Sequence, residues 1–253
     1  MINQRTFRIL FTLLIGLSAV LMLFTENPHS EEIGQDTGVF LYTAKMMNEG
    51  GAPYLDSWDH KGPFLFFLNL LAYKLHPNEL WGLFFLHAIL IFISICSLTF
   101  ALSKYLSWGV ISLGFAQYLV SSLRVYELDR TELYTAFFLM LSIAFYLIFE
   151  GRKKDWGYLL IGMLFSIVLL MRPNNAAFWG VLTVFLLVEC FQRKRITAKI
   201  IWLALGVLVV FSGTFLYLSH KGAVTAFFDQ YILYNFVYTT SGNDLVRSFV
   251  SLF

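Results

Sequence analysis

Long apolar runs bounded by charged residues constrain this chain more than any other feature. Seven runs approach the length of about 17–25 residues that a helix needs to cross a bilayer. They are approximately Ile9–Phe24, Leu80–Leu102, Leu106–Leu123, Leu133–Phe149, Trp156–Met171, Ala176–Phe191 and Ile200–Leu218. Only 13% of the residues are charged and 58% are hydrophobic, whereas an ordinary soluble domain is about 25% charged. We therefore predict an all-α polytopic membrane bundle of about seven spans.

The distribution of lysine and arginine predicts the orientation. These residues concentrate in MINQRTFR, SKYLS, EGRKKDWG and FQRKRITAK, whereas TENPHSEEIGQDTG is acidic. Basic loops stay on the cytoplasmic side, so we expect the N-terminus inside. No small-x-small cleavage site follows the first run, which we interpret as an uncleaved helix. Residues 25–79 then form one long external loop.

This loop contains two predicted helices that do not span. DTGVFLYTAKMMNEGG begins near Asp36 and ends in paired glycines, a helix stop signal. Val39, Tyr42 and Met46 fall on one stripe, as in a helix lying on the membrane surface. FLFFLNLLAYKL has about a dozen residues, too few to span, and Pro63 suits its first turn. Between the helices lies APYLDSWDHKGP, which is rich in turn residues.

The stretch DSWDHKGPFLFF places charge directly against an apolar segment, and other charges share its predicted side. Charge beside membrane spans usually serves ion, proton or substrate chemistry. The residues in question are Asp36, Asp56, Asp59, His60, Lys61, Arg124, Glu127, Asp129, Arg130, Glu132, Arg172 and Asn174. Simpler roles stay open for some: Asp56 as a turn residue, Arg172 as an interfacial anchor, and Asp129 with Arg130 as a surface pair. No H-x-H or H-E-x-x-H spacing is present, so no zinc site is predicted.

The external loop resembles that of membrane-embedded GT-C glycosyltransferases that use polyprenyl-phosphate sugars. The nearest resemblance is to the bacterial protein mannosyltransferase and aminoarabinose transferase superfamily, which includes lipopolysaccharide galacturonosyltransferase-like proteins. The matching elements, in order, are Asp36, Tyr42 with Ala44, Gly51 with Tyr54, Lys61 with Pro63, Glu132, and Arg172 with Pro173 and Asn174. The specific part is the first loop, and the order of spans extends the resemblance over most of the chain.

Two departures accompany this resemblance. Asp36 is followed by Thr37, whereas the family often has two adjacent acids. The family's chains usually have more spans and a C-terminal external domain, whereas NDLVRSFVSLF looks like the beginning of a further span. We therefore expect residues 1–253 to form a single transferase-like domain that is the N-terminal portion of a longer one.

The resemblance implies a transferase of the bacterial cell envelope, with its active site outside the plasma membrane. A sugar would move from a polyprenyl phosphate to a glycan, lipid or protein hydroxyl, with inversion. Asp36 is expected to be the base and Lys61 to stabilise the departing phosphate. The other expected substrate-binding residues are Tyr54, Asp59, His60, Arg124, Glu132, Arg172 and Asn174. No obligatory metal is expected, although a divalent cation bridged by carboxylates such as Glu132 is an alternative.

Other function classes stay open at this point. A transporter or lipid flippase would use the same charges to pass a polar substrate, but such proteins place charges near the bilayer midplane, where these spans have few. A non-catalytic transferase half is the third hypothesis. The aromatic segment SHKGAVTAFFDQYILYNFVYTTSGN favours an interfacial belt, with a substrate-gripping role for Asp229 and Asn235 as the alternative. The formal charge of +2 implies no nucleic-acid partner.

Overall fold

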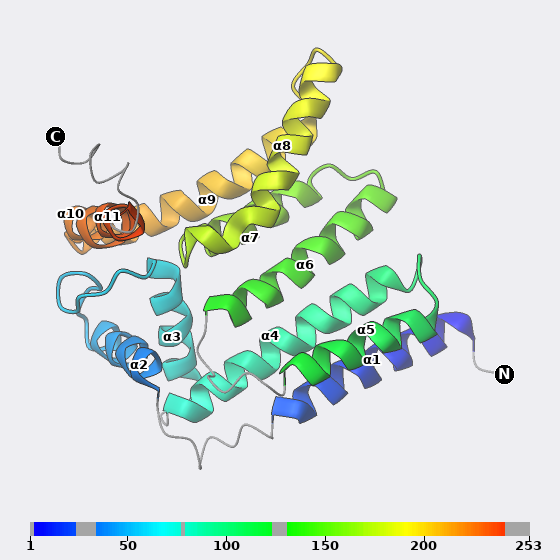
Figure 1. Cartoon of the computed structure of the whole chain (residues 1–253), viewed down its shortest axis with the longest axis horizontal. Helices are drawn as coiled ribbons and strands as arrows, with labels where there is room; N and C mark the ends of the chain where they lie inside the picture. The colour runs from blue at the N-terminus through cyan, green and yellow to red at the C-terminus, as the bar shows by residue number, and fades with distance from the viewer. Residues whose placement is uncertain (1–2, 24–33, 77–78, 123–130, 241–253) are drawn as a thin grey trace.

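The protein is built from helices joined by turns (Figure 1). The computed structural model describes residues 3–23, 34–76, 79–122 and 131–240, and these contain no strand, only one isolated bridge between Pro53 and Ser57. The helical elements are α1 Gln4–Leu23, α2 Gln35–Asn48, α3 Pro63–Leu75, α4 Glu79–Leu102, α5 Trp108–Ser122, α6 Thr131–Gly151, α7 Gly157–Leu169, η1 Pro173–Ala176, α8 Ala177–Gln192, α9 Ala198–His220, α10 Val224–Phe227, η2 Phe228–Leu233 and α11 Tyr234–Thr240. The all-α prediction is confirmed.

Every predicted span contains a helix, but five helices of the described residues are long and apolar enough to cross a membrane. These are Gln4–Leu23, Leu80–Leu102, Thr131–Gly151, Pro173–Gln192 and Ala198–His220. Helix α7 has 13 residues, or about 20 Å at 1.5 Å per residue, against a hydrocarbon core of about 30 Å. About seven spans were expected, and five helices of the described residues have the length and apolar composition to span.

Helix α7 is short because its predicted C-terminal end is not helical. Arg172 has extended backbone angles (φ −159°, ψ 108°), as is common for a residue that precedes a proline. The carbonyls of Leu170 and Met171 accept hydrogen bonds from Phe64 and Gly62, each at 3.0 Å. The chain therefore leaves the helix in order to pair with the long loop.

The helices pack side by side in a row, in which α1 contacts α4, α4 contacts α6, α6 contacts α7 and α7 contacts α9. Figure 1 shows α2, α3, α10 and α11 gathered at one end of this row, where α4 and α6 begin and α7 ends. The loops after α4, α6 and α8 lie at the opposite ends of their helices and carry Lys104 and the basic runs 152–154 and 193–195. Helices α2 and α3 and the basic loops thus occupy different ends of the row.

Helix α2 follows its predicted bounds and buries one face against α3. Phe40, Thr43 and Met47 are buried, and the ring of Phe40 lies 6.3 Å from that of Phe66 in α3. Tyr42, which the sequence analysis placed on the apolar stripe, is 62% exposed. Helix α3 packs against the Phe40 face, and it stays a prediction that the exposed Tyr42 side lies on a membrane surface.

Two glycines let α7 and α9 approach closely. A Cβ added at Gly162 would lie 2.1 Å from the carbonyl oxygen of Leu203, and one at Gly206 would lie 2.1 Å from that of Leu159. Small residues allow such backbone contact between membrane helices, where packing rather than hydrophobicity drives association. The α7–α9 contact therefore depends on residues without side chains at both positions.

We predict that Gly206→Ala lowers thermal stability while Gly213→Ala, in the same helix, does not. The added methyl group at 206 forces the backbones apart at a cost of about 1–3 kcal/mol, whereas no atom lies within 4 Å of a Cβ at 213. Alanine also favours an open helical site over glycine by about 1 kcal/mol. Circular dichroism during heating in detergent measures both; equal melting temperatures would contradict the close contact.

Candidate functional site

The candidate site is built on the loop between α2 and α3, residues 49–62. Its first turn is closed by Asp56, whose Oδ2 accepts a hydrogen bond from the Ala52 N–H at 2.8 Å, while the Asp56 N–H donates to the Ala52 carbonyl at 3.1 Å. Asp56 is exposed and holds the turn. The turn role that the sequence left open for Asp56 is the one its contacts support.

Tyr54 is a buried residue of this loop whose hydrogen bonds hold the loop in shape. It is only 3% exposed and adopts a φ of 70°, a left-handed conformation that costs a non-glycine residue about 1–3 kcal/mol. Its hydroxyl donates to the Lys61 carbonyl at 2.7 Å, and its own carbonyl accepts from the Gln230 side chain at 2.7 Å. These contacts hold the strained residue in place, and Tyr54 positions the Lys61 backbone rather than facing a cavity.

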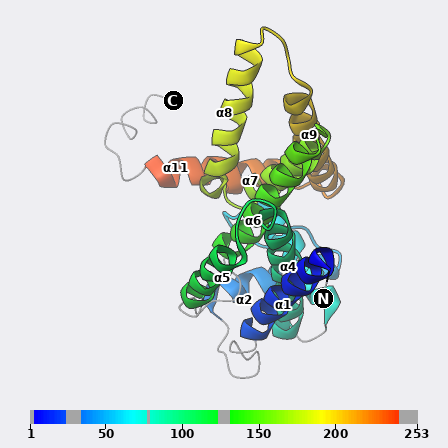
Figure 2. The same ribbon diagram turned by 90° about the vertical axis from the view of Figure 1, so that its right-hand side faces the viewer.

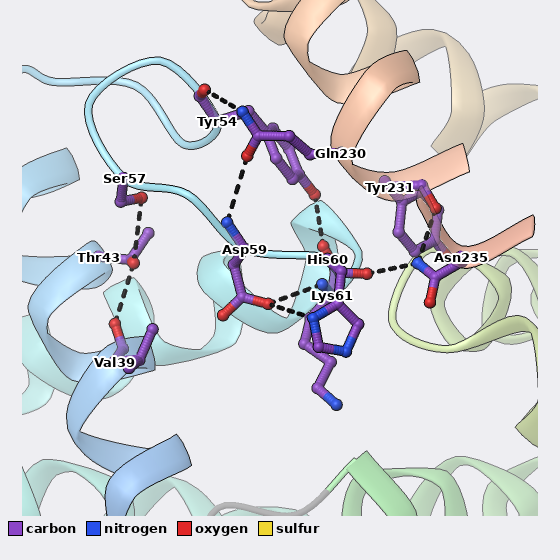
Figure 3. A network of polar contacts seen from close by, with 10 residues as sticks. All are labelled: Val39, Thr43, Tyr54, Ser57, Asp59, His60, Lys61, Gln230, Tyr231 and Asn235. Carbon is purple, nitrogen blue, oxygen red and sulfur yellow. Dashed lines mark hydrogen bonds and ion pairs between the residues drawn. The ribbon is translucent and has the colours of Figure 1, made fainter. Parts of the chain in front are cut away.

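Asp59, His60 and Lys61 form a compact charged turn (Figure 3). Oδ1 of Asp59 accepts from the Lys61 N–H at 2.8 Å and lies 3.7 Å from Nδ1 of His60. Burial raises the pKa of Asp59, and the Lys61 N–H with the neighbouring cations offsets part of that rise. Burial and Lys61 lower the pKa of His60. Near neutral pH, therefore, His60 is uncharged.

The C-terminal helical segment clamps this turn from above (Figure 3). Gln230 accepts from the Asp59 N–H at 3.2 Å, and the Asn235 side-chain amide donates to the His60 carbonyl at 2.6 Å. The Tyr231 hydroxyl donates to the Leu169 carbonyl at the end of α7. Gln230 and Tyr231 belong to η2, a π-helical turn, which is a frequent feature of functional sites. Two helix amides thus satisfy backbone groups that the irregular loop leaves open.

The other wall is the chain between α7 and α8. Arg172 forms an ion pair with Glu132 at the start of α6, with both side chains about half exposed. Asn175 donates to Thr135 Oγ1 at 3.1 Å. Exposed ion pairs contribute little to stability, so the Arg172–Glu132 pair chiefly fixes where the guanidinium lies.

A polar cavity of about 450 Å³ lies between these walls. It is lined by His60, Lys61, Met171, Arg172, Pro173, Asn174, Tyr231, Ile232, Asn235 and Phe236. An apolar groove of about 270 Å³ adjoins it, lined by Leu169, Leu170, Pro173, Phe211, Thr214, Phe215, Leu218, Phe227, Phe228, Tyr231 and Ile232. The two share Pro173, Tyr231 and Ile232. The polar cavity and the apolar groove are therefore adjacent.

The structure brings four of the nine predicted site residues to one cavity. Lys61, His60, Arg172 and Asn174 line the polar cavity. Asp36 is exposed in the first turn of α2, and its charge raises the pKa of His60 while that of Arg172 lowers it. All three therefore share one electrostatic neighbourhood.

The remaining predicted residues stand apart from the cavity lining. Tyr54 and Asp59 are buried behind it and hold the loop. Glu132 pairs with Arg172. Arg124 lies outside the described residues, as do Glu127, Asp129 and Arg130. Among the described residues, no three histidine, cysteine, aspartate or glutamate side chains are grouped to hold a metal ion.

Gln230 and Tyr231 are the residues that sequence reasoning missed. The sequence predicts an aromatic belt in this segment and indicates only Asp229 and Asn235 as possible substrate contacts. An amide inside an otherwise aromatic, apolar helix is the signal that could have found Gln230, since a polar group placed there needs a partner.

Comparison with known proteins places the chain in a family. Residues 3–252 match the family model described as "Putative competence-induced protein Ccs4 N-terminal domain", and the chain belongs to that family. No curated protein and no solved structure matches the chain.

We predict that Gln230→Ala loosens the charged turn. The variant loses the acceptor for the Asp59 N–H and the donor to Tyr54, each worth about 1 kcal/mol, so amide exchange at residue 59 should accelerate about tenfold. Gln230→Glu keeps the acceptor and should protect the amide more than alanine does. Hydrogen–deuterium exchange by mass spectrometry measures this, with exposed Asp229→Ala as control. Unchanged exchange in Gln230→Ala would contradict the clamp.

We also predict that His60 makes the fold acid-sensitive. Its folded pKa is lowered, so below the unfolded value of about 6.5 the unfolded chain binds more protons and stability falls as pH falls. Asp59, whose folded pKa is raised, regains stability at lower pH and opposes this trend. The melting temperature of the wild type should drop between pH 7.5 and 5.5, and by less in His60→Gln. An equal drop would exclude His60 as the cause.

Proposed function

We propose that this member of the Ccs4 N-terminal family is an integral-membrane glycosyltransferase. It moves a sugar from a polyprenyl-phosphate donor to an acceptor hydroxyl at the external face of the membrane. The observation that supports this best is the polar cavity carrying Lys61 and Arg172, which shares Pro173, Tyr231 and Ile232 with an adjacent apolar groove. A phosphate fits the first and an isoprenoid chain the second.

The cations suit the leaving group. As the bond between the anomeric carbon and the phosphate oxygen breaks, the electron pair leaves with the polyprenyl phosphate. Preorganised positive charge beside that oxygen stabilises the transition state in a site of low dielectric constant. Lys61 is held by backbone contacts on both sides, from Tyr54 and Asp59, and Arg172 is held by Glu132. The Lys61 backbone and the Arg172 guanidinium therefore have protein partners before the substrate arrives.

Asp36 is the proposed base. It takes the proton of the acceptor hydroxyl, whose oxygen then bonds to the anomeric carbon on the face opposite the departing phosphate, so the configuration inverts. An exposed carboxylate in the first turn of α2 can reach a soluble or lipid acceptor. The reaction as proposed requires no obligatory metal. A cation bridging a carboxylate and the phosphate is the alternative, and activity after EDTA treatment distinguishes the two.

The proposed topology has seven spans, with α5 and α7 as the short members and the N-terminus in the cytoplasm. The basic loops after α4, α6 and α8 then face inside, in accordance with the positive-inside rule. Helices α2 and α3 lie at the external interface of a bacterial plasma membrane, within the first loop, as in the GT-C class that the sequence resembles.

Transport is the second candidate, favoured by His87. This histidine is fully buried in α4, and neither ring nitrogen has a hydrogen-bond partner among the described residues. Its ring packs 5.0 Å from that of Tyr134. An ionisable residue inside a membrane span usually marks a functional path. Under this candidate, His87→Leu abolishes uptake or flipping; under the transferase proposal it leaves sugar transfer intact.

We predict that Asp36→Asn lowers sugar transfer by about 10²–10⁴-fold, the usual contribution of a general base. The substrates are undecaprenyl phosphates carrying radiolabelled hexoses or pentoses, supplied to membranes that contain the full reading frame. Glu49→Gln, at the far end of α2, is the matched control and should transfer normally. Wild-type transfer that Asp36→Asn leaves unchanged would exclude Asp36 as the base. No wild-type transfer from any donor would favour transport or a non-catalytic half.

A further inference from the structure

A second cavity lies away from the candidate site, toward the basic end of the bundle. It has a volume of about 550 Å³ and lies between the end of α6, the start of α7, and the halves of α8 and α9 near their connecting loop. Figures 1 and 2 show α8 leaning away from α6 and α7 at this end. The proposed transferase reaction uses none of its residues.

The polar side of this cavity is an alternating array of charges. The Lys199 ammonium donates to Oε1 of Glu150 and lies 3.8 Å from Oε2 of Glu189. Glu189 Oε1 in turn lies 2.9 Å from the Arg193 guanidinium at the rim. These two carboxylates and two cations have no net charge together. Such an array matches a ligand that itself carries one positive and one negative group.

Glu150 is fixed more tightly than Glu189. Oε1 of Glu150 accepts from both Lys199 and the Tyr158 hydroxyl, the latter at 2.7 Å. Glu189 has only one ion-pair contact shorter than 3.8 Å, and that partner, Arg193, is about half exposed. Glu189 is therefore the carboxylate best placed to exchange a partner for a bound cation, and Arg193 the cation best placed to meet an anion.

The apolar side of the cavity indicates that the ligand is a lipid. Phe185 and Val188 of α8 line it and remain 69% and 46% exposed. Large exposed apolar side chains beside a charged cluster are costly in water. They are suited to acyl chains, with the charges at head-group depth, where long basic side chains also reach.

We propose that this cavity binds one zwitterionic aminophospholipid of the phosphatidylethanolamine type. Its primary ammonium lies against Glu189, its phosphate lies between Lys199 and Arg193, and its acyl chains follow Phe185 and Val188. The carboxylates select a head group that donates N–H hydrogen bonds, so a choline head group, which has none, binds less well. An anionic glycerol head group lacks the cation and leaves Glu189 without a new partner.

The test is lipid selectivity in nanodiscs made from mixtures of phosphatidylethanolamine, phosphatidylcholine and phosphatidylglycerol. After transfer to detergent, native mass spectrometry counts the lipid molecules that stay bound. The wild type should retain phosphatidylethanolamine about tenfold over the other two. Equal retention of all three head groups, or preference for phosphatidylglycerol, overturns the proposal without any variant being needed.

Two variants locate the site. Glu189→Gln should abolish the head-group preference while a monodisperse, folded protein remains, and Val188→Trp should reduce retention of all three lipids by filling the cavity without changing charge. Glu49→Gln, exposed at the opposite end, is the control and should behave as wild type. Selectivity that survives both cavity variants overturns the assignment. Sugar transfer plays no part in this readout, so its outcome is independent of the proposed enzymatic function.

Discussion

The candidate site depends on two backbone hydrogen bonds that join segments more than a hundred residues apart. Gly62 and Phe64 donate to the carbonyls of Met171 and Leu170. Only glycine permits this approach, because a Cβ at position 62 would lie 2.0 Å from the Leu170 oxygen. This contact stops α7 short, places Lys61 beside Arg172 and fixes the start of α3. An irregular loop at a membrane surface needs such partners, since every buried backbone group must be satisfied.

The C-terminal helical segment also holds the loop and the end of α7 together. Gln230, Tyr231 and Asn235 reach from one helical stretch to the loop and to the end of α7. The same stretch lines both the polar cavity and the apolar groove. A single helical stretch therefore couples the shape of the polar cavity to that of the groove. It also helps to hold the strained Tyr54, because Gln230 donates to the Tyr54 carbonyl.

Local sequence signals predict much of this arrangement. The remainder depends on which elements pack against each other, and local signals do not contain that information. Apolar runs bounded by charge predicted the long helices, and Pro63 predicted the start of α3, since both signals are local. The loop charges Lys61, His60 and Arg172 were predicted to meet because the spans alternate in direction. The packing of α2 on α3, the end of α7 at Leu169 and the role of Gln230 were not predictable. Each depends on a contact with a segment distant in sequence, and helical spacing contains no information about that segment.

We propose that Lys61 and Arg172 hold a lipid phosphate whose tail fills the groove beside Pro173. Photo-crosslinking with diazirine-bearing undecaprenyl phosphate in membranes tests this directly. If the tail occupies the groove, the probe should label the groove residues Phe211, Phe215 and Phe228. That labelling should be suppressed by excess unlabelled undecaprenyl phosphate and in the double variant Lys61→Met with Arg172→Met. Labelling spread over all lipid-facing helices, or labelling of the groove that neither competitor nor variant changes, would contradict it.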